Sequence, residues 1–329
     1  MSEDKLRVLL LLMEEAEPIW GEELIRNIGI NHDLRIFDRS RPLEEQFFDV
    51  DAVVDVGGVC GTRAMLDEAP IVRFWQIAGT GFEHFDLEYW ASRPVMVSNL
   101  PGQMSAVALA EHALMFILLG QRKFSEAVDN VHAGVMFRPL GRELRGQTLL
   151  CIGFGASARE LSRRASAMGM RVIATDVVPV DEGTRDAWGA DAVFSADQLD
   201  ELLPEADVVS LHLHLNNETV HTLDERRLGL MKPTALVVNV ARGALVDEAA
   251  MVRAVREGRL AGACTDVATE EPLARDSALI TTQGVIVTPH TAGTTDGTAR
   301  RRAVGVAENL DRLAAGLEPL YRVDLLKRT

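Results

Sequence analysis

The sequence predicts an α/β protein with two doubly wound parallel-sheet domains. Short apolar runs alternate with helix-like stretches through the first hundred residues, and a second alternating series begins near residue 148. A long, almost wholly apolar stretch separates the two series. The chain of 329 residues is also longer than one hydrophobic core usually supports, so two domains are expected.

The first series consists of strand-like runs separated by helix-like stretches. Strands and helices that alternate in this way predict a parallel sheet with helices on both faces. The expected strands are Leu6–Met13, Ala52–Val56, Arg73–Ile77 and Val95–Val97, and the expected helices are Trp20–Asn27 and Thr62–Glu68.

The pattern changes near residue 100. Pro101-Gly102 indicates a turn, and the residues from Ser105 to about Asp129 are typical of one long helix. Because its Ala108–Leu119 part is almost wholly apolar, we expect that part to be buried on every side. Such a helix also suits packing against a second subunit, so we expect a homodimer.

The second series predicts another parallel sheet, and its two middle helices each begin with an aspartate that can cap a helix. The final helix, roughly Asp296–Gly316, has no partner in this sheet and is expected to return to the first domain. We therefore assign residues 1–100 with 294–329 to one discontinuous domain and residues 101–293 to the other. The expected strands are Thr148–Ile152, Val172–Thr175, Val208–Leu211, Leu236–Asn239, Gly262–Thr265 and Val285–Val287, and the expected helices are Ala156–Met168, Asp224–Met231 and Asp247–Glu257.

Charge and cysteine usage narrow the class of protein. The net charge of -15 opposes binding to nucleic acid or to an anionic membrane, because both would repel the chain. The apolar run Val8–Met13 is too short to span a bilayer. Cys60, Cys151 and Cys264 are odd in number and widely spaced, which is typical of reduced core cysteines in a cytoplasmic protein.

A glycine-rich motif opens the second series. Gly153-Phe-Gly155-Ala156-Ser157-Ala158 follows a strand and begins a helix, in the G-x-G-x-x-G/A pattern of dinucleotide sites. The first glycine permits a tight turn, the second lets backbone approach a pyrophosphate, and the third position needs only a small residue. N–H groups at the helix start can then face the phosphates.

Asp176 ends the strand that follows this motif. A carboxylate there can accept hydrogen bonds from both ribose hydroxyls and would repel a 2′-phosphate, so the sequence favours NAD over NADP. Alternatively, Asp176 is an ordinary turn residue at a strand end.

Further motifs occur along nearly the whole chain. Because of them, the chain resembles the D-isomer-specific 2-hydroxyacid dehydrogenase family, which implies a flavodoxin-like substrate domain, discontinuous in sequence, and a Rossmann NAD-binding domain. The motifs are Val97-Ser-Asn-Leu-Pro-Gly102, Ala110-Glu-His-Ala-Leu114, Val238-Asn-Val-Ala-Arg-Gly-Ala-Leu-Val-Asp247, Asp266-Val267 with Glu271-Pro-Leu273, and Thr288-Pro-His-Thr-Ala-Gly293.

The resemblance implies a hydride transfer between the cofactor and a small 2-hydroxy or 2-keto acid. It makes His290 the acid/base, Glu271 its carboxylate partner and Arg242 the substrate clamp. These types suit the chemistry, since histidine titrates near neutral pH, a carboxylate raises its pKa, and guanidinium offers a rigid fork to a substrate carboxylate. Each could alternatively be an ordinary loop residue.

The resemblance also implies supporting residues around the cofactor and the substrate. Ala156 and Ser157 should lie against the pyrophosphate, and Asp266 near the nicotinamide carboxamide. Glu111-His112 is interpreted as a structural pair, and no metal is expected at His212-x-His214. The remaining residues line the nicotinamide side (His212, Asn239, Val240, Ala241) or receive the substrate (Val56, Gly57, Gly58, Gly79, with Arg242).

The chain departs from the family pattern in ways that bear on substrate. Ala156-Ser157-Ala158 replaces a common arginine, isoleucine and glycine, which removes one cationic phosphate contact. Val56 and Gly57 replace the arginine and serine typical of phosphoglycerate dehydrogenases, which argues against a phosphorylated substrate. Phe82, Phe85 and Met104 hint at an apolar side-chain pocket.

Two alternatives remain open from the sequence. One is an NAD(H)-sensing interaction protein resembling the C-terminal-binding corepressors, which share the fold and recruit partners. The other is an NADP-dependent glyoxylate or hydroxypyruvate reductase.

Overall fold

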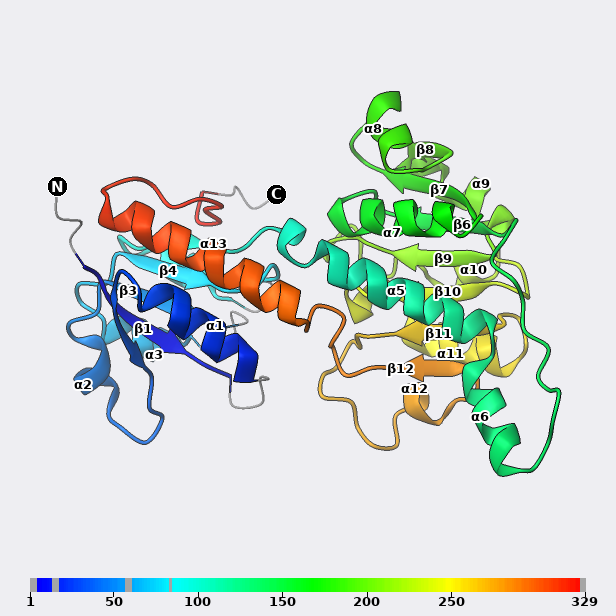
Figure 1. The fold of residues 1–329 in the computed structure, drawn as a ribbon, viewed down its shortest axis with the longest axis horizontal. Coiled ribbons are helices and arrows are strands. Elements are labelled where there is room, and N and C mark those ends of the chain that lie inside the picture. The colour runs from blue at the N-terminus through cyan, green and yellow to red at the C-terminus, as the bar shows by residue number, and fades with distance from the viewer. Residues whose placement is uncertain (1–4, 14–17, 57–60, 83–84, 326–329) are drawn as a thin grey trace. The chain divides into compact units, whose positions relative to one another are not determined.

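The computed structural model describes residues 5–13, 18–56, 61–82 and 85–325, and these residues form two compact units. Unit 1 comprises residues 1–104 and 295–329, and unit 2 comprises residues 105–294. The predicted fold class is confirmed, because each unit is built on a parallel sheet flanked by helices (Figure 1). Within the described residues, none of the helices has the length and apolar character needed to cross a membrane.

Unit 1 has a five-stranded sheet in the order β2-β1-β3-β4-β5, the doubly wound order of flavodoxin-like domains. The last helix, α13, packs beside α1 (Figure 1), and its apolar face joins the core of this sheet, so the unit is discontinuous in sequence. Its elements are β1 Arg7–Leu11, α1 Pro18–Ile28, β2 Asp33–Ile36, α2 Leu43–Phe47, β3 Ala52–Asp55, α3 Arg63–Asp67, β4 Phe74–Ile77, α4 Leu87–Ala91, β5 Met96–Ser98 and α13 Asp296–Ala314.

Unit 2 has a seven-stranded sheet in the order β12-β11-β10-β9-β6-β7-β8. The order reverses between β6 and β9, so the carboxyl ends of these two strands mark the topological switch point of a Rossmann sheet. Its elements are α5 Ala106–Gln121, α6 Phe124–His132, β6 Thr148–Ile152, α7 Ala156–Ala167, β7 Arg171–Asp176, α8 Glu182–Ala187, β8 Ala192–Ser195, α9 Leu199–Leu202, β9 Val208–Leu211, α10 Glu225–Leu228, β10 Leu236–Asn239, α11 Glu248–Arg256, β11 Gly262–Thr265, α12 Ala278–Thr281 and β12 Val285–Val287.

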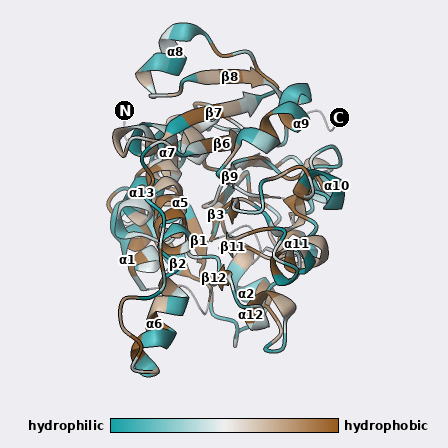
Figure 2. Cartoon of the chain, turned by 90° about the vertical axis from the view of Figure 1, so that its right-hand side faces the viewer, coloured by the Kyte–Doolittle hydropathy of each residue, from teal (hydrophilic) through white to brown (hydrophobic). Residues whose placement is uncertain are grey.

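The central strands of unit 2 are buried on both faces. In β6, Leu149 and Cys151 pack on the side of α5 and α7, whereas Leu150 and Ile152 pack on the opposite side. This alternation gives the sheet two apolar layers, as expected for a parallel sheet covered by helices. Figure 2 shows the contrast between the apolar strands β7 and β8 and the more polar helices α8 and α10.

The prediction of one long helix from Ser105 to Asp129 was wrong. The helix ends at Gln121, and Lys123 adopts a left-handed backbone conformation before α6 begins. Burial of Ala108–Leu119 on every side was also wrong, because Glu111 is exposed and Met115 is 37% exposed. The inward face of α5 packs on α7, β10 and β11, so one side of the helix stays accessible in the single chain.

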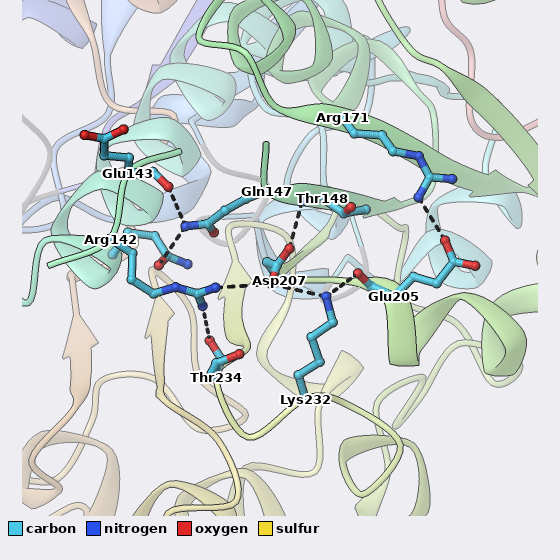
Figure 3. Close-up of polar contacts among 10 residues, drawn as sticks. Arg142, Glu143, Gln147, Thr148, Arg171, Glu205, Asp207, Lys232 and Thr234 are labelled. Carbon is cyan, nitrogen blue, oxygen red and sulfur yellow. Dashed lines mark hydrogen bonds and ion pairs between the residues drawn. The ribbon is translucent and has the colours of Figure 1, made fainter. Parts of the chain in front are cut away.

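The amino-terminal edge of this sheet is held by the carboxylate of Asp207 (Figure 3). It accepts a hydrogen bond from Thr148 N–H at 3.0 Å and pairs with Lys232 at 3.2 Å and Arg142 at 3.4 Å. Arg142 also donates to the carbonyl of Thr234. Because Arg142 follows α6 in sequence, this cluster anchors the segment after α6 to the sheet, at the edge opposite the strand carboxyl ends.

Candidate active site

The residues singled out in unit 2 gather at the carboxyl edge of its sheet. All strands of the sheet run parallel, so the loops that follow them emerge at the same edge. Strand by strand, the sequence candidates there are Gly153 after β6, Asp176 at the end of β7, His212 after β9, Asn239 at the end of β10, Asp266 after β11 and His290 after β12.

The glycine-rich turn has the geometry that a dinucleotide requires. Gly153 has a φ of 90°, and a Cβ there would lie 2.7 Å from the carbonyl oxygen of His212. Gly155 caps α7, and a Cβ there would meet open space, so backbone N–H groups at the helix start are accessible. Ala158 is fully buried against the sheet. The turn therefore fits a pyrophosphate.

Asp176 lies beside this turn. Its carboxylate accepts hydrogen bonds from Phe154 N–H at 2.7 Å and from Val178 N–H at 2.9 Å. Val177 and Val178 are exposed, and in the described part of the chain no lysine or arginine forms an ion pair with Asp176. The carboxylate is thus held in place by two backbone N–H groups, and the neighbouring turn holds Arg159, whose guanidinium donates to the Phe154 carbonyl at 2.9 Å.

Three neighbouring loops bring the predicted catalytic groups together. Arg242 follows β10, Glu271 follows β11 and His290 follows β12. The Nδ1 atom of His290 lies 2.7 Å from Oε2 of Glu271, while Oε1 of Glu271 accepts a hydrogen bond from Ala268 N–H at 2.8 Å. Both carboxylate oxygens are therefore engaged, and the imidazole orientation is defined.

The same contacts set the protonation of the pair. The hydrogen bond to Glu271 raises the pKa of His290 above its ordinary value, while the nearby Arg242 acts in the opposite direction. Burial alone would raise the pKa of Glu271, but hydrogen bonds from His290 and Ala268 N–H, together with Arg242, lower it overall. Glu271 is thus a carboxylate near neutral pH, and Arg242 is close enough to influence both groups.

A network around Asn239 positions Arg242. The side-chain oxygen of Asn239 accepts a hydrogen bond from Ala241 N–H at 3.0 Å, and its side-chain nitrogen donates to the Arg242 carbonyl at 2.8 Å. The Arg242 guanidinium in turn donates to the Ala241 carbonyl. Val240 and Ala241 are buried, and both backbone groups of Ala241 are used within this network.

Asp266 organises the loop that carries His290. Its buried carboxylate accepts hydrogen bonds from the Thr288 hydroxyl at 2.5 Å, from Thr291 N–H at 2.8 Å and from Ala292 N–H at 2.7 Å. Its carbonyl accepts from His290 N–H, and His290 itself has a φ of 56°. These contacts stabilise a left-handed conformation that is unfavourable for a non-glycine residue.

His112 supports the same loop from α5. Its Nε2 atom lies 2.9 Å from the Thr288 hydroxyl oxygen. Because that hydroxyl donates to Asp266, it must accept from His112, which places a proton on Nε2. The sequence interpretation of Glu111-His112 as a pair missed this role, since Glu111 instead approaches Arg164 at 3.6 Å.

Gly243 and Glu248 were missed by the sequence reasoning. A Cβ at Gly243 would overlap the backbone of Ala268 and Thr269, so only glycine lets the Arg242 loop lie against the Glu271 loop. Glu248, the first residue of α11, accepts a hydrogen bond from Thr269 N–H at 2.5 Å. A glycine directly after the arginine was the available sequence signal.

His212 is hydrogen-bonded to serines. Its Nδ1 and Nε2 atoms each lie 2.9 Å from a hydroxyl oxygen, those of Ser157 and Ser210 respectively. Burial lowers the pKa of His212 to about 4. Among the described residues, no three potential metal ligands are grouped here or elsewhere.

The substrate candidates of unit 1 lie at the carboxyl ends of adjacent strands. Val56 directly follows β3 and Gly79 lies two residues after β4, whereas Gly57 and Gly58 are outside the described residues. The buried Asp55 accepts from Gly61 N–H at 2.9 Å, which ties the far end of the Val56 loop to β3.

The suggested apolar pocket needs a correction at Phe85. Its ring packs on Trp75 and Trp90 in the core of unit 1 and is buried, so it does not line a pocket. Cys151 and Cys264 are buried free thiols, as expected, and Cys60 is outside the described residues.

Comparisons with known proteins identify relatives over almost the whole chain. Residues 114–292 match the family model of the D-isomer specific 2-hydroxyacid dehydrogenase NAD binding domain. An (S)-sulfolactate dehydrogenase of Chromohalobacter salexigens is 35% identical over 92% of this chain and 97% of its own length. A glyoxylate reductase of Aeropyrum pernix is 37% identical over 78% of this chain and 77% of its own length. A D-lactate dehydrogenase of Aquifex aeolicus, solved with NAD and lactic acid, superposes with a TM-score of 0.79 at 28% identity and covers 97% of this chain and 100% of its own.

Replacement of Gly243 should damage the site without unfolding unit 2. We expect Gly243→Ala to push the Ala268–Glu271 loop away from Arg242 and to lower kcat/KM by roughly 100-fold, the cost of about 1 Å of misplacement. The dissociation constant of NADH should change much less than kcat/KM, because the glycine-rich turn is untouched. Steady-state kinetics and fluorescence titration measure both quantities. Gly183→Ala in the distant helix α8 is the matched control, and an unimpaired Gly243→Ala enzyme would contradict this role.

Proposed function

The chain belongs to the D-isomer-specific 2-hydroxyacid dehydrogenase family, whose members are oxidoreductases with an NAD-binding Rossmann domain, and we propose that it interconverts a small D-2-hydroxy acid and its 2-keto acid with NAD(H). The observation that carries this proposal is the hydrogen bond between His290 and Glu271 with Arg242 close by, at the carboxyl edge of the Rossmann sheet.

His290 is proposed as the acid/base. Glu271 can only accept, so Nδ1 of His290 carries the proton in their hydrogen bond and Nε2 is the nitrogen that titrates. In the reducing direction, protonated Nε2 donates to the forming hydroxyl oxygen, and in the oxidising direction neutral Nε2 accepts that proton. The carboxylate of Glu271 stabilises the imidazolium and keeps the ring in one orientation.

Arg242 is proposed as the substrate clamp. Its guanidinium can bind the carboxylate of a 2-keto acid through two parallel hydrogen bonds and polarise the adjacent carbonyl. On unit 1, Gly57, Gly58 and Gly79 are proposed to contact the substrate through backbone N–H groups, whereas the Val56 N–H already donates to the Leu11 carbonyl at 3.1 Å and is not available for this role. When bound, the nicotinamide cofactor supplies or accepts the hydride.

The cofactor site is proposed to comprise the glycine-rich turn and the strand ends beside it. The Gly153–Ala158 turn fits a pyrophosphate, and Asp176 suits a ribose with free hydroxyls. The absence of a cation at exposed Val177 and Val178 supports NAD over NADP. The other proposed contacts are His212, Asn239, Val240, Ala241 and Asp266, the last of which already accepts three protein hydrogen bonds.

The substrate is proposed to be small and unphosphorylated. The named relatives include glyoxylate reductases, a D-lactate dehydrogenase and an (S)-sulfolactate dehydrogenase. Val56 and Gly57 provide neither the cation nor the hydroxyl with which phosphoglycerate dehydrogenases typically bind a phosphate.

A homodimer is proposed through the segment that follows α5. None of the residues of α6 is buried, and Phe137 and Leu140 are 100% and 90% exposed. Val131 and Met136 are also largely exposed. An apolar surface of this kind is unusual on a monomer, and the Asp207–Arg142 contacts hold its base in place.

A combined substrate and cofactor screen tests the reaction. We expect NADH oxidation with glyoxylate, pyruvate, hydroxypyruvate or sulfopyruvate, little with phosphohydroxypyruvate, and a preference for NADH over NADPH of at least about ten-fold that Asp176→Ser abolishes. His290→Ala should lose at least about 100-fold in kcat with NADH binding retained. Binding of NADH without turnover on any 2-keto acid would instead favour a sensor, and an NADPH preference would favour the NADP-dependent reductase.

The pH profile tests the Glu271–His290 pair. Reduction requires protonated His290, so kcat/KM for the keto acid should fall as pH rises through the raised pKa of this residue. Glu271→Gln removes the group that raises the pKa, so the falling limb should move to lower pH. For oxidation of the hydroxy acid, the rising limb should move in the same direction. Profiles of the two enzymes that coincide would contradict the assignment.

Light scattering after size-exclusion chromatography tests the dimer. Leu140→Asp places a charge in the proposed apolar interface and should produce monomers at micromolar concentration. Ile30→Asp, at an exposed apolar residue of unit 1, is the matched control and should remain dimeric. A monomeric wild-type protein would refute the proposed interface.

A further inference from the structure

The imidazole of His212 lies between two hydroxyl groups of different character. Ser157 is the second residue of α7 and is partly exposed, whereas Ser210 lies within β9 and is fully buried. Each hydroxyl oxygen is 2.9 Å from one ring nitrogen, Nδ1 for Ser157 and Nε2 for Ser210. One imidazole therefore links the buried Ser210 to the partly exposed Ser157.

The burial of Ser210 and the low pKa of His212 determine which atom donates in each of these two hydrogen bonds. Because the pKa of His212 is lowered to about 4, its ring is neutral near pH 7 and carries one proton. Among the described residues, His212 Nε2 is the acceptor that the buried Ser210 hydroxyl reaches. Ser210 therefore donates to Nε2, because the opposite arrangement would leave its hydroxyl proton buried without a partner.

This arrangement determines what the Ser157 hydroxyl can do. With Nε2 accepting, the ring proton is on Nδ1 and is donated to the Ser157 oxygen. The Ser157 proton then has no acceptor among the hydrogen bonds of the described residues, and it lies in the first turn of α7, next to Gly155 and the open space beside it. If Ser157 instead donated to His212, it would have no proton to offer a ligand at that helix end.

We infer that the Ser210–His212–Ser157 chain makes the Ser157 side chain a hydrogen-bond donor to the pyrophosphate of the dinucleotide. Phosphate oxygens only accept, so a serine held in the donor state suits them. The contact would partly replace the arginine that Ala156 lacks in the glycine-rich turn. The inference rests on the dinucleotide site proposed above.

Titration of each enzyme form with NADH, followed by fluorescence, tests the donor. Ser157→Ala should raise the dissociation constant about ten-fold or more, as expected for loss of one hydrogen bond to a charged group. Ser157→Thr retains the hydroxyl and should stay within about two-fold of wild type. Ser166→Ala, in the last turn of the same helix, is the matched control. Equal affinity of Ser157→Ala and wild type would overturn the inference.

A double-mutant cycle tests the role of the buried serine. Ser210→Ala frees His212 to adopt either tautomer, so it should weaken NADH binding by a smaller factor, about three-fold. In the Ser157→Ala background the same change should have no further effect, because the donor that it orients is already gone. Additive losses would show that Ser210 acts independently of Ser157 and would contradict the chain.

The tautomer can be measured without any cofactor. In protein labelled with ¹⁵N-histidine, a long-range ¹H–¹⁵N spectrum should show His212 protonated at Nδ1, with its signals assigned by their loss in His212→Gln. An Nε2-protonated ring would overturn the inference. Failure of the wild-type protein to bind NADH would contradict the proposed dinucleotide site itself, and the tautomer of His212 would still decide whether Ser157 is held as a donor.

Discussion

The common direction of the strands is the constraint on which the rest of unit 2 depends. Seven parallel strands expose their carboxyl ends at one edge, so residues far apart in sequence, such as Gly153 and His290, emerge from the same side of one sheet. At the opposite edge, the carboxylate of Asp207 pairs with Arg142 and Lys232. The candidate active-site residues and the Asp207 cluster therefore lie at opposite edges of a single sheet.

Buried and half-buried carboxylates also fix the conformation of the loops that form the candidate site. Asp266 is nearly inaccessible to solvent, and its charge is compensated by two backbone N–H groups and the Thr288 hydroxyl. A buried carboxylate without such donors would be strongly destabilising, so the loop that provides them is held tightly. This explains how His290 can keep a left-handed backbone conformation and still present its ring to Glu271.

The sequence predicted the elements whose burial produces a clear apolar pattern, and it missed elements and contacts that produce no such pattern. Strands β9 to β12 were predicted with their observed bounds because they are flanked by turns and are mostly buried. Strands β2 and β8 were missed, because β2 is mostly exposed and contains two charged residues, and β8 offers only three apolar residues, all half-buried. The break between α5 and α6 at Lys123 was also missed, because lysine carries no signal for a left-handed backbone. Motifs located the Arg242, Glu271 and His290 loops, and Gly243 lies within one of them, but the support from His112 and Glu248 depends on three-dimensional contacts that spacing cannot reveal.

Two histidines at the same edge illustrate how environment divides their roles. His290 faces a carboxylate, which raises its pKa, so this ring can take up and release a proton near neutral pH. His212 is half-buried between two hydroxyls, which cannot compensate a positive charge, so desolvation lowers its pKa to about 4 and the ring stays neutral. A neutral imidazole with one donor and one acceptor is suited to orienting its neighbours rather than to transferring a proton. Identical side chains therefore serve different purposes because one contacts an anion and the other contacts only neutral groups.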